Sequence, residues 1–276
     1  MLKTLEKNSR MNFEEWGKEQ LIVTAELIED IRKKRFEPEY SFLLHQKSIY
    51  CLMGDVSEIQ HAMIQIAISE LGGIPVIITP AYFAEGIASF KFLENTGAGI
   101  ILSLGNLEIK SDIYSSIHNL QIPLLNADSY LTVLSLFNIL KGLLLEELPG
   151  KTVLIEVTEI DELNKEFPLE EFCRFLSIVE VNLILNESNQ NKSKKEYLDG
   201  SLKEIYSEKT PANYDLLLQI EKNQDTKSIG YREGIDVTNG CKKDSPLVKL
   251  DGKIEEYRLH SLKALIALMM PGIRRN

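Results

Sequence analysis

The hydrophobic and polar positions of the chain alternate between the period of an amphipathic helix and that of a buried strand. Between residues 14 and 34, apolar side chains recur at helical spacing, and the segment ends in basic residues, as suits a helix C-terminus. Short apolar runs and helical segments then follow in turn. The expected strands cover 48–53, 74–79, 99–104 and 122–125, and the expected helices 57–71, 83–95, 109–119 and 129–147. This alternation predicts a parallel sheet covered on both faces.

A second series of the same kind begins after Pro149 and Gly150, which interrupt the pattern. The expected strands cover 151–157, 179–185 and 247–250, the expected helices 168–176, 198–207 and 254–270, and the polar segment 186–196 is expected to be a surface loop. Between residues 214 and 240 the pattern is weak. We therefore predict an α/β protein of two Rossmann-like three-layer α/β/α lobes with parallel sheets, linked by a long helix and a C-terminal helix.

Pro149 and Gly150 also set the expected domain boundary. The N-terminal lobe is expected to cover residues 1–148, with the C-terminal helix 254–272 packing back on it. The C-terminal lobe is expected to cover residues 149–253 and is the shorter of the two.

The composition is that of a soluble globular protein, with 44% apolar and 26% charged residues in 276. The net charge of −10 leaves no basic surplus for a nucleic-acid partner. No apolar stretch reaches the ~20 residues of a membrane span, so neither export nor membrane insertion is expected. The three cysteines are far apart, without the spacing of a disulfide framework or a zinc site. We expect reduced thiols, no metal, no cofactor and a cytoplasmic location.

Arginine is missing from a long part of the chain, since none occurs between Arg35 and Arg174. Lysine is also sparse there, and it binds phosphate as a point charge without the guanidinium fork. The first lobe is therefore expected to be a poor phosphate site.

Four colinear stretches resemble the aspartate/ornithine carbamoyltransferase family. Residues 67–76 (AISELGGIPV) are similar to the family's first-lobe helix with its Gly turn, 123–140 (PLLNADSYLTVLSLFNIL) to its strand and linking helix, and 231–239 (YREGIDVTN) to its R-G-x-E-V-T-D stretch. Most specific are residues 256–264 (EYRLHSLKA), which resemble the terminal E-N-R-x-H-x-x-K-A motif. The resemblance, over about residues 14–270, implies the two-lobed fold, a homotrimer and carbamoyl transfer from carbamoyl phosphate to an amino group.

Most of the family's carbamoyl-phosphate ligands are nevertheless missing from the matching positions. The S-T-R-T-R motif falls on residues 57–61 (SEIQH), where only Ser57 matches and Glu58 would repel a phosphate at the helix N-terminus. The strand-end Arg falls near Ser103, the H-P-x-Q region becomes 129–134, and the H-C-L-P loop becomes 226–229. Only Ser57 and Arg258 remain at matching positions.

The resemblance thus implies candidate substrate-binding residues but no catalytic residue. They are Arg258 and Ser57, which match the family motifs, and His61, Tyr130 and Lys227, which replace family ligands or could line a changed pocket. Structural interpretations stand beside these. Arg258 could instead pair with Glu255 or Glu256, and Ser57 is expected to cap a helix in a capping box with Gln60. His61 could simply be a polar residue of the first helical turn, while His260 is expected to be structural and Asn126 to serve a turn.

Two functions follow from this mixture of retained and lost residues. The favoured one is a non-catalytic carbamoyltransferase-like subunit with a binding, regulatory or assembly role. The alternative is an active carbamoyl- or related group transferase, acting on an amino group of an amino acid-like substrate with a remodelled pocket or one shared with a neighbouring subunit. The candidate partners are other copies of the chain in a homotrimer, an amino acid-like small molecule and a partner protein.

Overall fold

The computed structural model describes residues 16–78, 87–105, 120–128, 130–144, 148–157, 169–187, 194–198, 201–205, 215–223, 226–233 and 248–269. The chain divides into two compact units, the first made of residues 1–131 and 258–276 and the second of residues 132–257. It passes from the first unit to the second within helix α6 (Tyr130–Leu143) and returns within helix α9 (Asp251–Met269).

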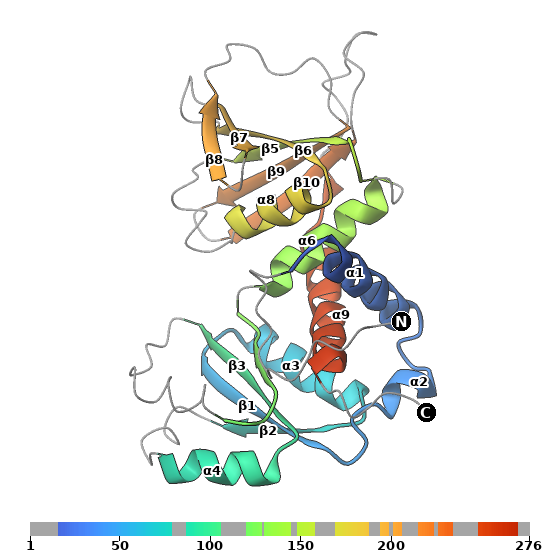
Figure 1. Ribbon diagram of the computed structural model, residues 1–276, viewed down its shortest axis with the longest axis vertical. Helices are drawn as coiled ribbons and strands as arrows, with labels where there is room; N and C mark the ends of the chain where they lie inside the picture. The colour runs from blue at the N-terminus through green and yellow to red at the C-terminus, as the bar shows by residue number, and fades with distance from the viewer. Residues whose placement is uncertain are drawn as a thin grey trace. The chain divides into compact units, whose positions relative to one another are not determined.

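The first unit is built on a four-stranded sheet in the order β2-β1-β3-β4. The strands are β1 (Ser48–Asp55), β2 (Ile74–Ile78), β3 (Gly99–Gly105) and β4 (Leu124–Asn126), and every pairing among them is parallel. Helix α3 (Glu58–Glu70) joins β1 to β2, helix α4 (Ile87–Thr96) lies between β2 and β3 in the chain, and the two helices lie on opposite faces of the sheet (Figure 1). This confirms the parallel sheet that the alternation predicts.

The core of this sheet comes from continuous apolar runs, as expected for strands covered on both faces. Residues 49–53 of β1 and 99–103 of β3 are all buried. On one face Tyr50 and Leu52 of β1 join Ile100 and Leu102 of β3 and Leu93 of α4 in one hydrophobic cluster. Burial of each such leucine or isoleucine contributes about 1.5–3 kcal/mol, which fixes which face of each strand meets α4.

Three further helices complete the described part of the first unit. Helix α1 (Lys18–Lys33) buries Leu21, Ala25, Ile28 and Ile31 on one face and has a basic last turn, as predicted. Helix α2 (Pro38–Ser41) follows it, and the part of α9 from residue 258 onward buries most of its side chains. In the parts of the chain that are described, no helix is both long and apolar enough to cross a membrane.

The second unit contains a seven-stranded sheet in the order β11-β10-β9-β5-β6-β7-β8. Its members are β5 (Thr152–Val157), β6 (Asn182–Glu187), β7 (Lys194–Leu198), β8 (Ser201–Ile205), β9 (Leu216–Asn223), β10 (Thr226–Glu233) and β11 (Val248–Lys249), with helix α8 (Leu169–Ile178) between β5 and β6. Only β9, β5 and β6 pair in parallel. The two-lobed α/β class is confirmed, and the antiparallel strands on both sides of this parallel centre were not predicted.

Two sequence predictions in the second unit are wrong. Residues 201–205 form β8 where a helix over 198–207 is predicted, and 194–196 belong to β7 where a surface loop is predicted. The pairing of Leu198 with Ser201 leaves Asp199-Gly200 between the strands, a dipeptide that favours a two-residue hairpin connection. The weakly patterned region holds a second hairpin, β9 with β10. The predicted helix 109–119 lies outside the described residues.

Candidate functional site

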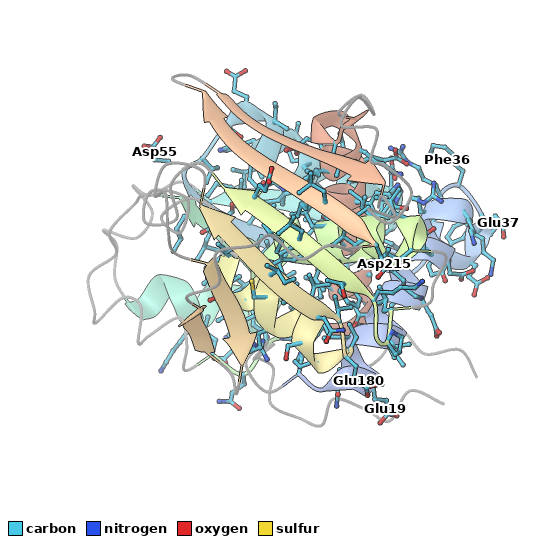
Figure 2. The ribbon with its side chains drawn as sticks, turned by 90° about the horizontal axis from the view of Figure 1, so that it is seen from above. Glu19, Phe36, Glu37, Asp55, Glu180 and Asp215 are labelled. Atoms are coloured by element: carbon cyan, nitrogen blue, oxygen red, sulfur yellow. The ribbon has the colours of Figure 1, made fainter. Side chains whose placement is uncertain are left out.

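The carboxyl ends of β1, β3 and β4 bring several polar groups together in the first unit. Ligands of open parallel α/β sheets bind at this edge. β1 and β3 approach closely here, because a Cβ on Gly105 would lie 2.0 Å from the Asp55 carbonyl oxygen and a Cβ on Gly54 2.3 Å from the Leu104 carbonyl oxygen. Gly105 also has φ +58°, a conformation that glycine adopts without strain. Asp55 itself is exposed and projects away from the ribbon (Figure 2).

Gln60 is the buried centre of this edge, with only 6% of its surface exposed. Its Nε2 donates to Ser103 Oγ at 3.3 Å and to the Ala127 carbonyl oxygen at 3.4 Å, while its Oε1 accepts from Arg258 Nη2 at 2.6 Å. One amide therefore ties α3 to β3, to the residue after β4 and to α9. Gln60 and Arg258 are 198 residues apart in the chain.

Asp128 follows β4 and accepts three hydrogen bonds through its carboxylate. Its Oδ1 accepts from Ser103 Oγ at 2.9 Å, and its Oδ2 accepts from the backbone N–H of Leu104 at 2.7 Å and of Gly105 at 3.3 Å. The backbone N–H of Asp128 donates to Asn126 Oδ1 at 2.9 Å, which confirms the turn role predicted for Asn126. We call the three donors, Ser103 Oγ and the backbone N–H groups of Leu104 and Gly105, the oxyanion cradle.

These bonds form one directed chain from a cation to an anion. Arg258 donates to Gln60, Gln60 donates to Ser103, and Ser103 donates to the Asp128 carboxylate. Because every member donates in the same direction, the bonds polarise and strengthen one another. The hydroxyl of Ser103 is fully buried, so the chain also satisfies a polar group that would otherwise be costly.

The structure brings together only part of the predicted site. Ser57 caps α3 by accepting from the Gln60 N–H at 3.2 Å, as predicted, but the Gln60 side chain turns to Arg258 and Ser103 instead of completing the capping box. Arg258 is half-buried and reaches this same Gln60, a partner that neither interpretation of Arg258 named. Sequence reasoning missed the roles of Gln60 and Asp128, because Gln60 was interpreted only as a capping-box residue and no role was predicted for Asp128.

The other three candidates lie on three different elements, α3, α6 and β10. His61 is half-exposed on α3, and its backbone N–H bonds the Ser57 carbonyl oxygen. Tyr130 is the half-exposed first residue of α6, two positions after Asp128. Lys227 lies on β10 of the second unit, opposite Lys222 of β9. Their roles in ligand binding stay predictions.

A second polar cluster lies along α3 and α9 of the first unit. Glu70 accepts from Arg35 at 3.0–3.1 Å through Nε and at 2.5 Å through Nη2, and it also accepts from Lys263, whose side chain is only 1% exposed. Burial alone would raise the pKa of Glu70, but the bonds from Arg35 and Lys263 outweigh it and the pKa is lowered. We call Arg35, Glu70 and Lys263 the buried ion cluster.

His260 lies beside this cluster and is 1% exposed. Burial, followed by the charges of Lys263 and Arg35, lowers its pKa to about 4. Its Nδ1 has no hydrogen-bond partner among the residues described. The histidine and lysine of the terminal motif thus serve the interior of the first unit, while its arginine reaches the carboxyl edge of the sheet.

Neither cysteine chemistry nor a metal centre emerges from the described ranges. Cys51 and Cys173 are buried, and burial raises the pKa of Cys51 to about 12, so its thiol is a poor nucleophile at neutral pH. No three His, Cys, Asp or Glu side chains within those ranges are grouped so that they could hold a metal ion. Cys241 lies outside them.

The fold is similar to those of solved aspartate transcarbamoylases. The catalytic subunit from M. jannaschii is 15% identical, with 65% of this chain and 60% of that chain covered at a TM-score of 0.53. The T. cruzi enzyme in complex with phosphate is 13% identical, with 97% and 98% covered at 0.62. The same enzyme in complex with carbamoyl phosphate and aspartate is 16% identical, with 65% and 57% covered at 0.51.

Two of these alignments span less than two thirds of the compared protein's length. No protein-family model and no curated protein matches the sequence. Identities of this size bear on the fold alone.

Proposed function

We propose that this chain, which has the two-lobed fold of aspartate carbamoyltransferases, has lost ordinary carbamoyl phosphate chemistry and acts as a non-catalytic binding, regulatory or assembly subunit. The proposal concerns the first unit, where the resemblance to the family would require a phosphate site. Phosphoryl oxygens are bound by cationic and N–H donors that are aimed at them and free to bind.

The charge at the carboxyl edge of the first sheet carries this proposal. The described residues at or just after the ends of β1, β3 and β4 include three exposed carboxylates, Asp55, Glu58 and Asp128. The guanidinium that reaches the edge, that of Arg258, donates to the chain's own Gln60. A phosphate 4 Å from an exposed carboxylate is repelled by about 1 kcal/mol per pair of unit charges in water and by more at a partly buried position. The edge is therefore unfavourable for a phosphate dianion.

Arg258 is also the observation that favours the alternative function. It keeps its place in the terminal motif and presents a half-buried guanidinium beside the strand ends. In an active transferase with a remodelled pocket, this group would bind an anionic part of an amino acid-like substrate. A binding experiment separates the two functions.

The experiment titrates the purified full-length protein with carbamoyl phosphate and with a bisubstrate phosphonate in a calorimeter. Carbamoylation of ornithine, aspartate and putrescine is then assayed with the same protein. We expect no binding tighter than millimolar and no turnover. Micromolar binding or turnover with any of these substrates would contradict the loss of carbamoyl phosphate chemistry and favour the alternative.

A double substitution tests whether the helix N-terminus limits phosphate binding. Glu58 and Ile59 are both exposed, Ile59 by 63%, so Glu58→Thr with Ile59→Arg removes a repelling charge and adds a guanidinium without disturbing the core. We expect phosphate affinity to rise by about thirtyfold, since the lost repulsion and the added attraction contribute about 1 kcal/mol each. Glu19→Thr, an exposed acidic residue of α1, is the control and should leave the affinity unchanged. No gain from the double substitution would mean that the phosphate site is lost for other reasons.

We further propose a homotrimer, on the strength of the family resemblance. Light scattering of the purified chain, coupled to size-exclusion chromatography, measures its mass directly. A mass near three chains of 31.4 kDa is expected. A monomer or dimer at micromolar concentration would contradict it.

A further inference from the structure

We propose that Asp128 is the resident anion of the oxyanion cradle, and that removing its carboxylate opens the cradle to a small free oxyanion. The ligand class is a carboxylate or a phosphate, and Asp128 is the residue that keeps such ligands out of the unmodified chain. The inference rests on the proposed loss of carbamoyl phosphate chemistry and names the group that blocks anions at that edge.

The donors of the cradle converge as they do around a bound anion. Ser103, Leu104 and Gly105 are consecutive, and all three donate to one carboxylate. The two backbone N–H groups donate to a single oxygen, Asp128 Oδ2, while the Ser103 hydroxyl donates to Asp128 Oδ1. Successive backbone N–H groups that point into one concavity bind anions. Here the N–H groups of Leu104 and Gly105 meet at one oxygen.

Contacts other than those of Asp128 also hold this part of the backbone. The donors stand at the end of β3, whose register with β1 runs to the pair Asp55 and Gly105. A side chain at position 105 is excluded, because a Cβ there would lie 2.0 Å from the Asp55 carbonyl oxygen. Ser103 is held on its other side by Gln60. The sheet and Gln60 therefore support the shape of the cradle on the sides that Asp128 does not contact.

The spacing of the acceptors defines the ligand. Two oxygens of one carboxylate bridge the hydroxyl and the paired N–H groups, so acetate reproduces the natural occupant and inorganic phosphate offers the same pair of oxygens. Asp128 is exposed, so the space that its carboxylate leaves opens to solvent. In the unmodified chain a second anion would have to approach the Asp128 carboxylate without donors of its own, and mutual repulsion excludes it.

Four proteins are compared by calorimetry and by amide NMR spectra, with inorganic phosphate and then acetate as ligand. They are the unmodified chain, Asp128→Ala, Asp128→Asn and Asp55→Ala. The alanine at position 128 uncovers the donors, whereas asparagine removes the charge but keeps an oxygen against them. Asp55→Ala removes an equal charge from the neighbouring strand end and leaves the cradle occupied.

We expect only Asp128→Ala to bind, with a Kd of about 1–10 mM for either anion, at least tenfold tighter than for the unmodified chain. The backbone N–H signals of Leu104 and Gly105 should shift as the ligand is added. A folded Asp128→Ala protein that binds neither anion would overturn the proposal. An equal gain in Asp55→Ala would also overturn it, because charge alone would then explain the binding.

The same two ligands also test the proposal if the Asp128→Ala variant folds poorly. If Asp128→Ala is unstable, 50 mM phosphate or acetate should raise its unfolding temperature by several degrees and leave that of Asp55→Ala unchanged. Absence of this stabilisation would count against the cradle. Carbamoyl phosphate binding by the unmodified chain would contradict the proposed function. If neither that chain nor Asp128→Ala binds phosphate or acetate, only the role proposed for Asp128 is contradicted.

Discussion

The carboxylate of Glu70 pairs with two cations of the first unit, Arg35 and Lys263. The Lys263 side chain is 1% exposed, that of Glu70 18% and that of Arg35 35%. Glu70→Gln removes the negative charge at constant shape and leaves a buried ammonium beside a guanidinium. The perturbation therefore tests whether the charge of Glu70 stabilises this unit.

The expected cost follows from these exposures. Removing one partner of a fully buried ion pair costs about 3–5 kcal/mol. Three features reduce it here: Glu70 is partly solvated, the glutamine oxygen still accepts a hydrogen bond, and burial already lowers the pKa of Lys263, which eases loss of its proton. We expect the free energy of unfolding to fall by about 2–4 kcal/mol, a large part of the roughly 5–15 kcal/mol of a typical domain.

Urea unfolding monitored by tryptophan fluorescence measures this loss of stability in the first unit, which contains Glu70. Trp16 is the chain's sole tryptophan, is 4% exposed and belongs to the first unit. Linear extrapolation gives the free energy of unfolding for Glu70→Gln, Lys263→Met and the double variant. Because both single variants break the same interaction, the double variant should be less destabilised than their sum by at least about 1.5 kcal/mol.

A half-exposed pair that lacks a fully buried partner such as Lys263 serves as the matched control. Glu29 and Arg32 lie 3.0 Å apart on one face of α1, with side chains 24% and 34% exposed. Glu29→Gln should cost no more than about 1 kcal/mol, since solvent screens such pairs. A cost below about 1 kcal/mol for Glu70→Gln, or a cycle that is additive within about 0.5 kcal/mol, would refute the reasoning.

Three further predictions concern pH and backbone geometry. The pKa of His260 is lowered to about 4 by burial and by the cations of the buried ion cluster, so between pH 6.5 and 4 the unfolded chain binds more protons. Stability should fall by about 3 kcal/mol as pH drops through that window, and His260→Gln should flatten the profile, whereas exposed His45→Gln should not. Gly105→Ala should destabilise by at least about 2 kcal/mol, because its φ is +58° and the new Cβ would meet the Asp55 carbonyl. Gly142→Ala, within α6 and with open space around it, should stabilise by about 0.5–1 kcal/mol, as measured by circular dichroism.

The elements of the first unit were predictable because their signals are local. The runs 48–53 and 99–104 are mostly apolar, as buried parallel strands are, and they lie within β1 and β3. Ser57 marks the start of α3 through a hydrogen bond that spans only three residues. Such elements are predicted correctly because the pattern that defines each one lies within the segment itself.

The hairpins of the second unit were not predictable in the same way. β7 and β8 read KKEYL and SLKEI, which lack an apolar run, and their pairing with each other and with β6 makes them strands. Strand preference depends on what lies alongside more than on the residues themselves. The prediction of a helix over 198–207 failed for this reason.

The sequence by itself determined the acidic balance, the two-lobed α/β class, the strands of the first unit and the absence of arginine between Arg35 and Arg174. Only the tertiary structure decided that Arg258 returns to Gln60 at the carboxyl edge of that arginine-free region, and that Asp128 occupies the donors of residues 103–105. The physical reason is that backbone N–H groups are present at every residue except proline and carry no side-chain signature. Whether these N–H groups bind an anion, and whether that anion is a side chain or a free ligand, depends on which distant segment the fold places against them.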